Sequence, residues 1–295
     1  MRFGITALEF GPIANELVRG GVPDLSRFNL VAHAKHALQI RDISVLELSL
    51  DICHIIPDAF TEQTLADLND LKDEYGVSYT VHLPLYSIEL ATFNNPVREG
   101  GIDSIVSAIK TVESLNPEAY VLHSTGPLAA EYSRLTYPAE TVRTICTLMS
   151  AFSANSIEEI ISKSEIDPRK LAVENLEFPF DITRTVIDEY DTSICFDTGH
   201  LLSKQSGDES VLEFYQKHRD RIIEVHLHDG CATKITEGSG YIDHRPLGTY
   251  DLPVRDFLMK LMDDKFSGPL IFELGTAQTE ESLAKIREVV PEALT

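Results

Sequence analysis

The pattern that decides the fold is clearest in Ser193–His200, which reads SICFDTGH. A short apolar run, too short for a helix, ends at Asp197, and His200 follows in the next turn. Such a run predicts a buried strand. Seven further runs of this kind lie on either side of it: Arg2–Leu8, Ser44–Asp51, Ser78–Leu83, Ala119–His123, Leu171–Glu174, Ile222–His228 and Leu270–Glu273.

Longer amphipathic stretches with helical spacing follow the eight predicted strands. They are Ser26–Gln39, Thr61–Tyr75, Gly101–Leu115, Pro138–Ser164, Asp181–Tyr190, Ser210–His218, Pro253–Asp263 and Glu280–Val289. Eight strands, each followed by a helix, predict a (β/α)8 TIM barrel, because closure removes both sheet edges and buries each strand on both faces. No linker-like composition divides the chain, so we expect a single domain over residues 1–295. An open doubly wound sheet would favour a glycine-rich phosphate loop after an early strand, and Glu9–Pro12 reads EFGP instead.

Composition restricts the partners that we expect. The chain has 295 residues, 25 Lys and Arg, 47 Asp and Glu, and a net charge of −22. Duplex DNA is therefore not expected as a partner, since phosphate contacts need clustered basic residues. No stretch approaches the roughly 18 apolar residues of a membrane span, and the first residues lack a signal-peptide pattern. The four cysteines show no CxxC spacing, and a reduced, cytoplasmic protein is the expectation.

Polar residues finish six consecutive predicted strands: His82, His123, Glu174, Asp197, His226 and Glu273. Active sites of TIM barrels lie at this carboxyl end of the strands. A single histidine or carboxylate there is ordinary, but six converging on one mouth would repel or lack partners unless cations joined them. Ligation by His, Asp and Glu without thiolate suits zinc, manganese or iron. The set exceeds the need of one ion, so we expect two or three divalent metal ions and no organic cofactor.

This ordered set of strand ends resembles the xylose isomerase-like barrel superfamily, which includes endonuclease IV-type phosphodiesterases and sugar isomerases and epimerases. The resemblance covers essentially the whole chain. It implies a bridging role for Glu174 and the following metal ligands: His82, His123, Glu174, Asp197, His200, His226, His244 and Glu273. One departure concerns the third metal. Endonuclease IV-like proteins carry Asp two places before the loop histidine, where this chain has Ile242, and Asp243 is adjacent instead.

Two pairs of segments narrow the resemblance. Tyr79–Leu85 with Glu89–Asn94, and Val173–Leu176 with Asp197–Leu202, are similar to a branch that acts as a phosphodiesterase in cobamide remodelling. This resemblance implies a small-molecule substrate, with a cobamide as the candidate class.

Three functional hypotheses follow. The first is metal-dependent phosphodiester hydrolysis, with Glu174, Glu273 and His200 as catalytic residues and metal-activated water as the nucleophile. The second is sugar or sugar-phosphate isomerisation or epimerisation, in which one metal suffices and two carboxylates on opposite faces, Glu174 and Glu273, move a proton. The third is a binding barrel without catalysis, which predicts gaps in the ligand set that strands three to eight do not show.

The remaining candidates have ordinary alternatives. His228 is an extra ligand, a substrate contact or a loop histidine; Asn175 either orients substrate or caps the turn after its strand. Arg245 and Lys234 can meet a phosphate or remain solvated charges. The long loop Gly230–Tyr250 is a candidate lid.

Overall fold

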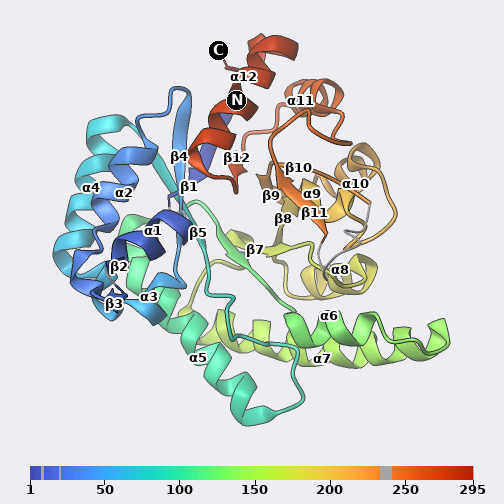
Figure 1. The fold of residues 1–295 in the computed structure, drawn as a ribbon. Coiled ribbons are helices and arrows are strands. Elements are labelled where there is room, and N and C mark those ends of the chain that lie inside the picture. The colour runs from blue at the N-terminus through green and yellow to red at the C-terminus, as the bar shows by residue number, and fades with distance from the viewer. Residues whose placement is uncertain (8–9, 20, 233–240, 295) are drawn as a thin grey trace.

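Eight parallel strands form a closed barrel in the computed structural model, which describes residues 1–7, 10–19, 21–232 and 241–294. Around the barrel the order is β1-β4-β5-β6-β7-β8-β9-β12, with β12 paired to β1 (Figure 1). These strands are β1 (Arg2–Thr6), β4 (Ile43–Ser49), β5 (Ser78–His82), β6 (Tyr120–Leu122), β7 (Leu171–Glu174), β8 (Ser193–Asp197), β9 (Ile222–His226) and β12 (Pro269–Phe272). The predicted (β/α)8 TIM-barrel fold is confirmed.

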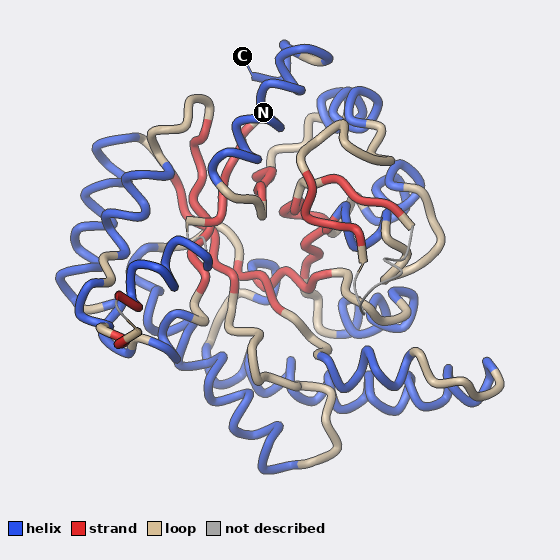
Figure 2. The backbone as a smooth tube through the Cα atoms, in the orientation of Figure 1, coloured by secondary structure: helices blue, strands red, loops and turns tan. Residues whose placement is uncertain are grey.

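Helices surround this barrel, as the tube view shows (Figure 2). They are α1 (Phe10–Leu17), α2 (Leu30–Ala37), α3 (Ile52–Ile55), α4 (Glu62–Tyr75), α5 (Asn95–Val112), α6 (Pro127–Ser133), α7 (Ala139–Ser164), α8 (Phe180–Glu189), α9 (Thr198–Leu202), α10 (Val211–His218), α11 (Val254–Asp263) and α12 (Thr276–Val289). Short 3-10 helices cover Leu25–Arg27, Pro57–Phe60, Glu113–Leu115, Pro168–Lys170 and Pro291–Leu294. Within the described residues, no helix is long and apolar enough to cross a membrane.

Local sequence explains where several helices begin and which face they bury. Thr61 caps α4 by accepting a hydrogen bond from the Thr64 amide, and Leu68 and Leu71 face the core. Ser210 and Glu213 form a capping box at the start of α10. The predicted helix over Ser26–Gln39 is shorter, because Leu25–Arg27 forms a 3-10 turn before Asn29 caps α2.

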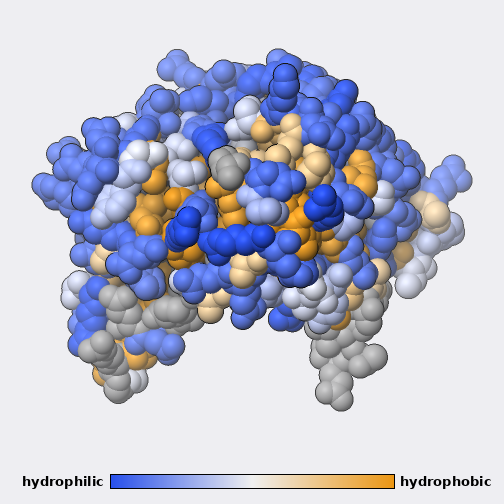
Figure 3. Space-filling view, turned by 90° about the horizontal axis from the view of Figure 1, so that it is seen from above, coloured by the Kyte–Doolittle hydropathy of each residue, from blue (hydrophilic) through white to orange (hydrophobic). Residues whose placement is uncertain are grey.

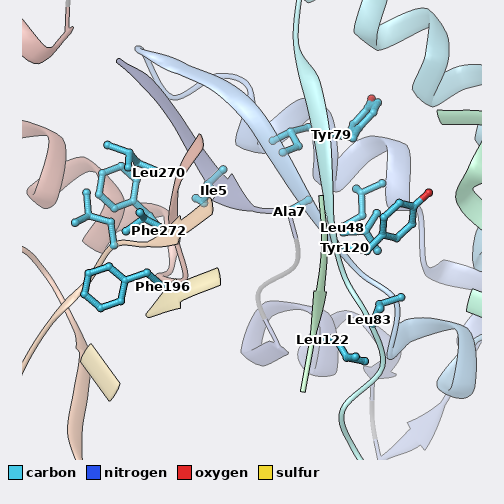
Figure 4. Packing of buried hydrophobic residues seen from close by; sticks show 14 of the residues in the cluster. Ile5, Ala7, Leu48, Tyr79, Leu83, Tyr120, Leu122, Phe196, Leu270 and Phe272 are labelled. Carbon is cyan, nitrogen blue, oxygen red and sulfur yellow. The ribbon is translucent and has the colours of Figure 1, made fainter. Parts of the chain in front are cut away.

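The core lies between strands and helices. Outward-facing residues such as Leu46 and Leu48 of β4 pack beneath the helices. Figure 4 shows Tyr79, Tyr120 and Leu122 on one side of the barrel and Phe196, Leu270 and Phe272 on another; these belong to the large cluster of buried hydrophobic residues. The surface seen in Figure 3 is mostly hydrophilic, with smaller apolar areas between the polar residues.

The inside of the barrel holds the alternate residues of each strand. Val121, Ala172 and Cys195 form a small separate cluster there, each two residues before a polar strand end. The space is tight, since a Cβ on Gly4 would lie 2.4 Å from Ile271 Cδ1. Polar side chains two residues further along therefore emerge at the mouth.

Two small hairpins stand at the ends of the barrel strands. The first pairs β2 (Val18–Arg19) with β3 (Val22–Pro23), and the second pairs β10 (Asp229–Cys231) with β11 (Ile242–Arg245). In Figure 1, α1 with β2 and β3 lies on the opposite side of the barrel from β10 and β11. The candidate lid Gly230–Tyr250 includes this second hairpin except its first residue, Asp229, but residues 233–240, with Lys234, lie outside the described residues.

Candidate metal centre

The last inward-facing positions of six strands carry the predicted ligands. β8 and β9 pair Asp197 with His226, whereas His82 on β5 pairs with a residue two positions before the ligand on β6, and Glu174 on β7 does the same with β8. His123 and Glu273 directly follow β6 and β12. The side-chain distances place all six predicted strand-end ligands around one opening, because two groups of possible metal ligands share Glu174 and together contain all six.

The first group of ligands contains His82, His123 and Glu174, with one ligand atom from each within 4.8 Å of the others. Glu174 Oε2 lies 2.8 Å from His123 Nε2 and 3.5 Å from His82 Nε2. His82 Nδ1 is 2.9 Å from the Leu83 carbonyl oxygen, which fixes the ring with Nε2 toward the group.

The second group contains Glu174, Asp197, His226 and Glu273. His226 Nδ1 is 3.1 Å from Glu273 Oε2, 3.7 Å from Glu174 Oε1 and 3.8 Å from Asp197 Oδ2. This Nδ1 atom is buried and makes no hydrogen bond with the described residues. Glu174 takes part in both groups through different oxygens, which is the geometry of a bridging carboxylate.

The third group joins His200, Asp243 and His244, and a further one joins Asp197, His228, His244 and Glu273. Asp243 and His244 lie in a β-bulge, because three residue steps on β11 oppose two on β10. His244 has a φ of 50°, in the left-handed region. Both side chains therefore reach the mouth. Asp243 lies there although it is adjacent to His244, and not two places before it as in endonuclease IV-like proteins.

Two glycines make room for this hairpin and for the ring of His228. A Cβ on Gly230 would lie 2.5 Å from the Ile242 carbonyl oxygen, and a Cβ on Gly199 would lie 2.2 Å from the ring of His228. Asp229 fixes the loop after β11 by accepting hydrogen bonds from the backbone amides of Gly248, Tyr250 and Leu252.

The structure places the three predicted substrate-binding residues differently. His228 is buried in the centre, with Nε2 2.8 Å from Asp197 Oδ2 and Nδ1 accepting a hydrogen bond from the His244 amide. The Asn175 side chain is buried and bonds to both the amide and the carbonyl of Asp197, an arrangement suited to positioning that ligand. Arg245 is exposed at the end of β11. Their predicted contacts with substrate stay predictions.

Sequence reasoning missed two buried carboxylates. Glu47 Oε2 is 3.2 Å from His226 Nε2, so it orients the ring whose Nδ1 faces the second group. Glu224 is fully buried, and burial together with the negative Glu47 raises its pKa well above the usual value. The signal was period-two alternation, since Glu224 stands two residues before His226 on the same strand.

Histidines supply the local positive charge. Burial disfavours a charged His82, yet its hydrogen bond to Glu174 and the fields of Glu47 and Glu273 raise its pKa to about 9. Burial likewise opposes the negative charge of Glu174, but the field and hydrogen bond of His123 outweigh it and hold the pKa of Glu174 well below its usual range. None of the described Lys or Arg side chains forms an ion pair with Glu174, Asp197 or Glu273.

This donor set fits divalent metal ions. Each group offers imidazole nitrogens and carboxylate oxygens and no cysteine, which suits zinc, manganese or iron. Among the described residues, only histidines neutralise these buried carboxylates, and one histidine nitrogen lacks a hydrogen bond. A cation would satisfy both the carboxylates and that nitrogen.

The sequence of this barrel matches a known protein family. Residues 34–289 match the family of xylose isomerase-like TIM barrels. The chain belongs to this family. The resemblance predicted from the strand ends is confirmed at this level, and endonuclease IV and sugar epimerases are both among the similar structures.

Individual relatives of this xylose isomerase-like barrel are distant. The uncharacterised protein MJ1311 of Methanocaldococcus jannaschii is 24% identical over 99% of this chain and 91% of that protein. A D-tagatose 3-epimerase-like protein superposes with a TM-score of 0.70 at 19% identity, covering 99% of this chain and 98% of the other. Endonuclease IV from Thermus thermophilus superposes with a TM-score of 0.63 at 14% identity, covering 99% and 100%. These structures share the fold and, at such identities, do not assign the reaction.

Proposed function

We propose that this protein is a metal-dependent phosphodiester hydrolase that acts on a small substrate. The observation that carries the proposal is the position of Glu174 between two ligand groups, with Oε2 beside His123 and Oε1 beside His200. One carboxylate shared by two separate groups suits two neighbouring ions, and paired ions suit displacement at phosphorus.

Each group of side chains has a part in this proposal. Bound divalent ions would supply the charge that activates water and neutralises the phosphate oxygens. His82 and His123 would hold one ion with Glu174, and Asp197, His226 and Glu273 would hold a second. His200, Asp243 and His244 would hold a third or orient the phosphate.

We propose that two of the predicted catalytic residues handle protons. His200 Nδ1 lies 3.2 Å from Glu174 Oε1, so it can hold a proton against that oxygen. Glu273 lies between His226 and His244 and is partly exposed, so it can exchange a proton with a molecule at the mouth.

Four finer proposals concern the metal, the substrate, the partners and the location. Zinc, manganese or iron follows from the donor types alone, and a cobamide substrate follows only from the two pairs of sequence segments. Exclusion of duplex DNA as a partner follows from the net charge of −22, and the cytoplasmic location is the expectation of the sequence analysis. All four stay predictions.

The alternative is sugar isomerisation or epimerisation. The second group, with Glu174, Asp197, His226 and Glu273, holds enough ligands for a single ion by itself. Several structurally similar proteins are named as epimerases, among them the D-tagatose 3-epimerase-like protein and an L-ribulose 3-epimerase. This alternative leaves His82 and His123 without a metal role.

A comparison of two substrates tests the proposal. Protein reconstituted with zinc, manganese or iron(II) would be given bis(4-nitrophenyl) phosphate and, separately, D-tagatose. We expect release of 4-nitrophenolate at least about 100-fold faster than with chelator-treated protein, and no change in the NMR spectrum of the sugar. Epimerised sugar without phosphodiester cleavage would replace the proposal by its alternative.

A further inference from the structure

A cavity of about 350 Å³ opens at the carboxyl ends of β1 and β4, the two barrel strands that do not end at a predicted ligand. It lies between α1, the β2–β3 hairpin and α3. Aliphatic side chains form most of its wall: Ile13, Ala14, Leu17, Val18, Ile52 and Ile55. Its volume is within the usual range of small-molecule pockets.

Register places this cavity beside the metal centre. Ser49, in its wall, pairs with His82 on the neighbouring strand β5. Thr6, also in its wall, pairs with Glu47, whose carboxylate contacts His226. Because neighbouring strands are about 5 Å apart, Ser49 and Thr6 of the wall each lie one strand away from a residue of the metal centre.

The polar groups of the wall are few and mostly engaged. The Asp51 carboxylate accepts hydrogen bonds from the Leu85 and Tyr86 amides. The Thr6 hydroxyl is buried and has no partner among the described residues. A sugar would lose water from several hydroxyl groups here and regain few hydrogen bonds. An apolar or aromatic group with one polar atom near Thr6 matches the wall better.

We propose that this cavity binds an apolar, ring-sized substituent of the substrate whose phosphate lies at the metal centre. The inference rests on the proposed hydrolysis and adds a substrate class to it: phosphodiesters that carry a bulky apolar or aromatic arm. Tyr86, which lines the opening and is 65% exposed, provides a ring surface at its rim.

The binding of a phosphate monoester tests this subsite without relying on hydrolysis. Isothermal titration calorimetry on metal-reconstituted protein would compare 2-naphthyl phosphate with inorganic phosphate, which share the charged group and differ in the ring. We expect the naphthyl ester to bind about tenfold or more tightly, because its ring leaves water for the aliphatic wall.

Matched variants locate the effect. Ile55, in the wall, is 45% exposed, and Leu148 on α7, outside the wall, is 61% exposed, so both tolerate a polar side chain. We expect Ile55→Asp to reduce the naphthyl preference below threefold and Leu148→Asp to leave it unchanged. Ala14→Phe, which fills the cavity, should also abolish the preference while phosphate binding persists.

Equal binding of the two probes by the parent protein overturns the subsite, as does an equal response of Ile55→Asp and Leu148→Asp. Failure of the proposed function looks different: bis(4-nitrophenyl) phosphate would stay intact while the naphthyl preference and its loss in Ile55→Asp remained.

Discussion

At Glu174 the two carboxylate oxygens have different neighbours. Oε2 lies 2.8 Å from His123 Nε2, and Oε1 lies 3.2 Å from His200 Nδ1 and 3.7 Å from His226 Nδ1. The side chain is almost completely buried, so its charge is little screened by water. Without cations, a buried carboxylate in this position lowers the stability of the fold. When two cations bind, it can be a ligand to both.

Glu174→Gln is therefore the most informative single substitution. It preserves the shape but removes the charge that balances two ions, and we expect phosphodiester hydrolysis to fall by roughly three orders of magnitude, with lower metal content. Glu177→Gln, three residues further along the chain, is the control and should stay within a few-fold of the parent. Near-parental hydrolysis by Glu174→Gln would show that Glu174 is not the bridge.

His218, outside the metal centre, gives the fold a pH dependence. It is the buried last residue of α10, and its Nδ1 accepts a hydrogen bond from Arg184 Nη1 of α8 at 2.8 Å. Burial, with the positive charges of Arg184 and Lys217, lowers its pKa to about 4. The folded state thus keeps His218 neutral where the unfolded chain, with a pKa near 6.5, takes up a proton.

Between pH 6.5 and 4 the unfolded state therefore binds more protons at this position, and stability falls as the pH falls. We expect His218→Gln to lose less stability than the parent over this window. Urea unfolding of metal-free protein at pH 7.5, 6 and 5 measures it. Parallel pH dependence of the parent and His218→Gln would mean that His218 contributes nothing to acid sensitivity.

At the scale of elements, the β10–β11 hairpin delivers Asp243 and His244 to the mouth. Gly230 is opposite the bulge, where a Cβ would lie 2.5 Å from the Ile242 carbonyl oxygen. The contact is with backbone, so a side chain there must displace β11 as a whole.

Gly230→Ala should consequently weaken the third ligand group and leave the first intact. We expect a destabilisation of about 1–3 kcal/mol and loss of the most weakly held metal ion, measured by thermal unfolding and metal titration. Gly100→Ala on α5 is the control, because a Cβ there meets nothing within 4 Å. The same metal affinity in both variants would show that the hairpin does not contribute to metal binding.

Strands and strand ends could be predicted because parallel strands in a barrel align their carboxyl ends, so chain order alone gathers His82, His123 and Glu174. The bulge could not be predicted, since a positive φ at His244 has no sequence signature. Glu47 could have been predicted from its strand, by alternation. Its contact with His226 could not, because it crosses the barrel interior past β1 and β12, which lie between the two strands.

At the scale of the whole molecule, the mouth of the barrel has a polar part, formed by the predicted ligands, and an apolar part. Six strands, from β5 to β9 and β12, end at the predicted ligands, while β1 and β4 end at the apolar cavity. A substrate with a charged group and an apolar arm fits both parts. None of the described Lys or Arg side chains pairs with Glu174, Asp197 or Glu273, so bound cations are the proposed means of holding an anion there.

Metal content per chain tests the central claim, a bridged centre with at least two ions, most directly. Metal content would be measured by inductively coupled plasma mass spectrometry on the reconstituted, desalted parent protein and on the His82→Asn/His123→Asn double variant. We predict two or more ions in the parent and one fewer in the double variant, with Asp197, His226 and Glu273 retaining an ion, because Glu174 cannot hold the first ion without other donors. At most one ion in the parent, or unchanged metal content in the folded double variant, would contradict the account.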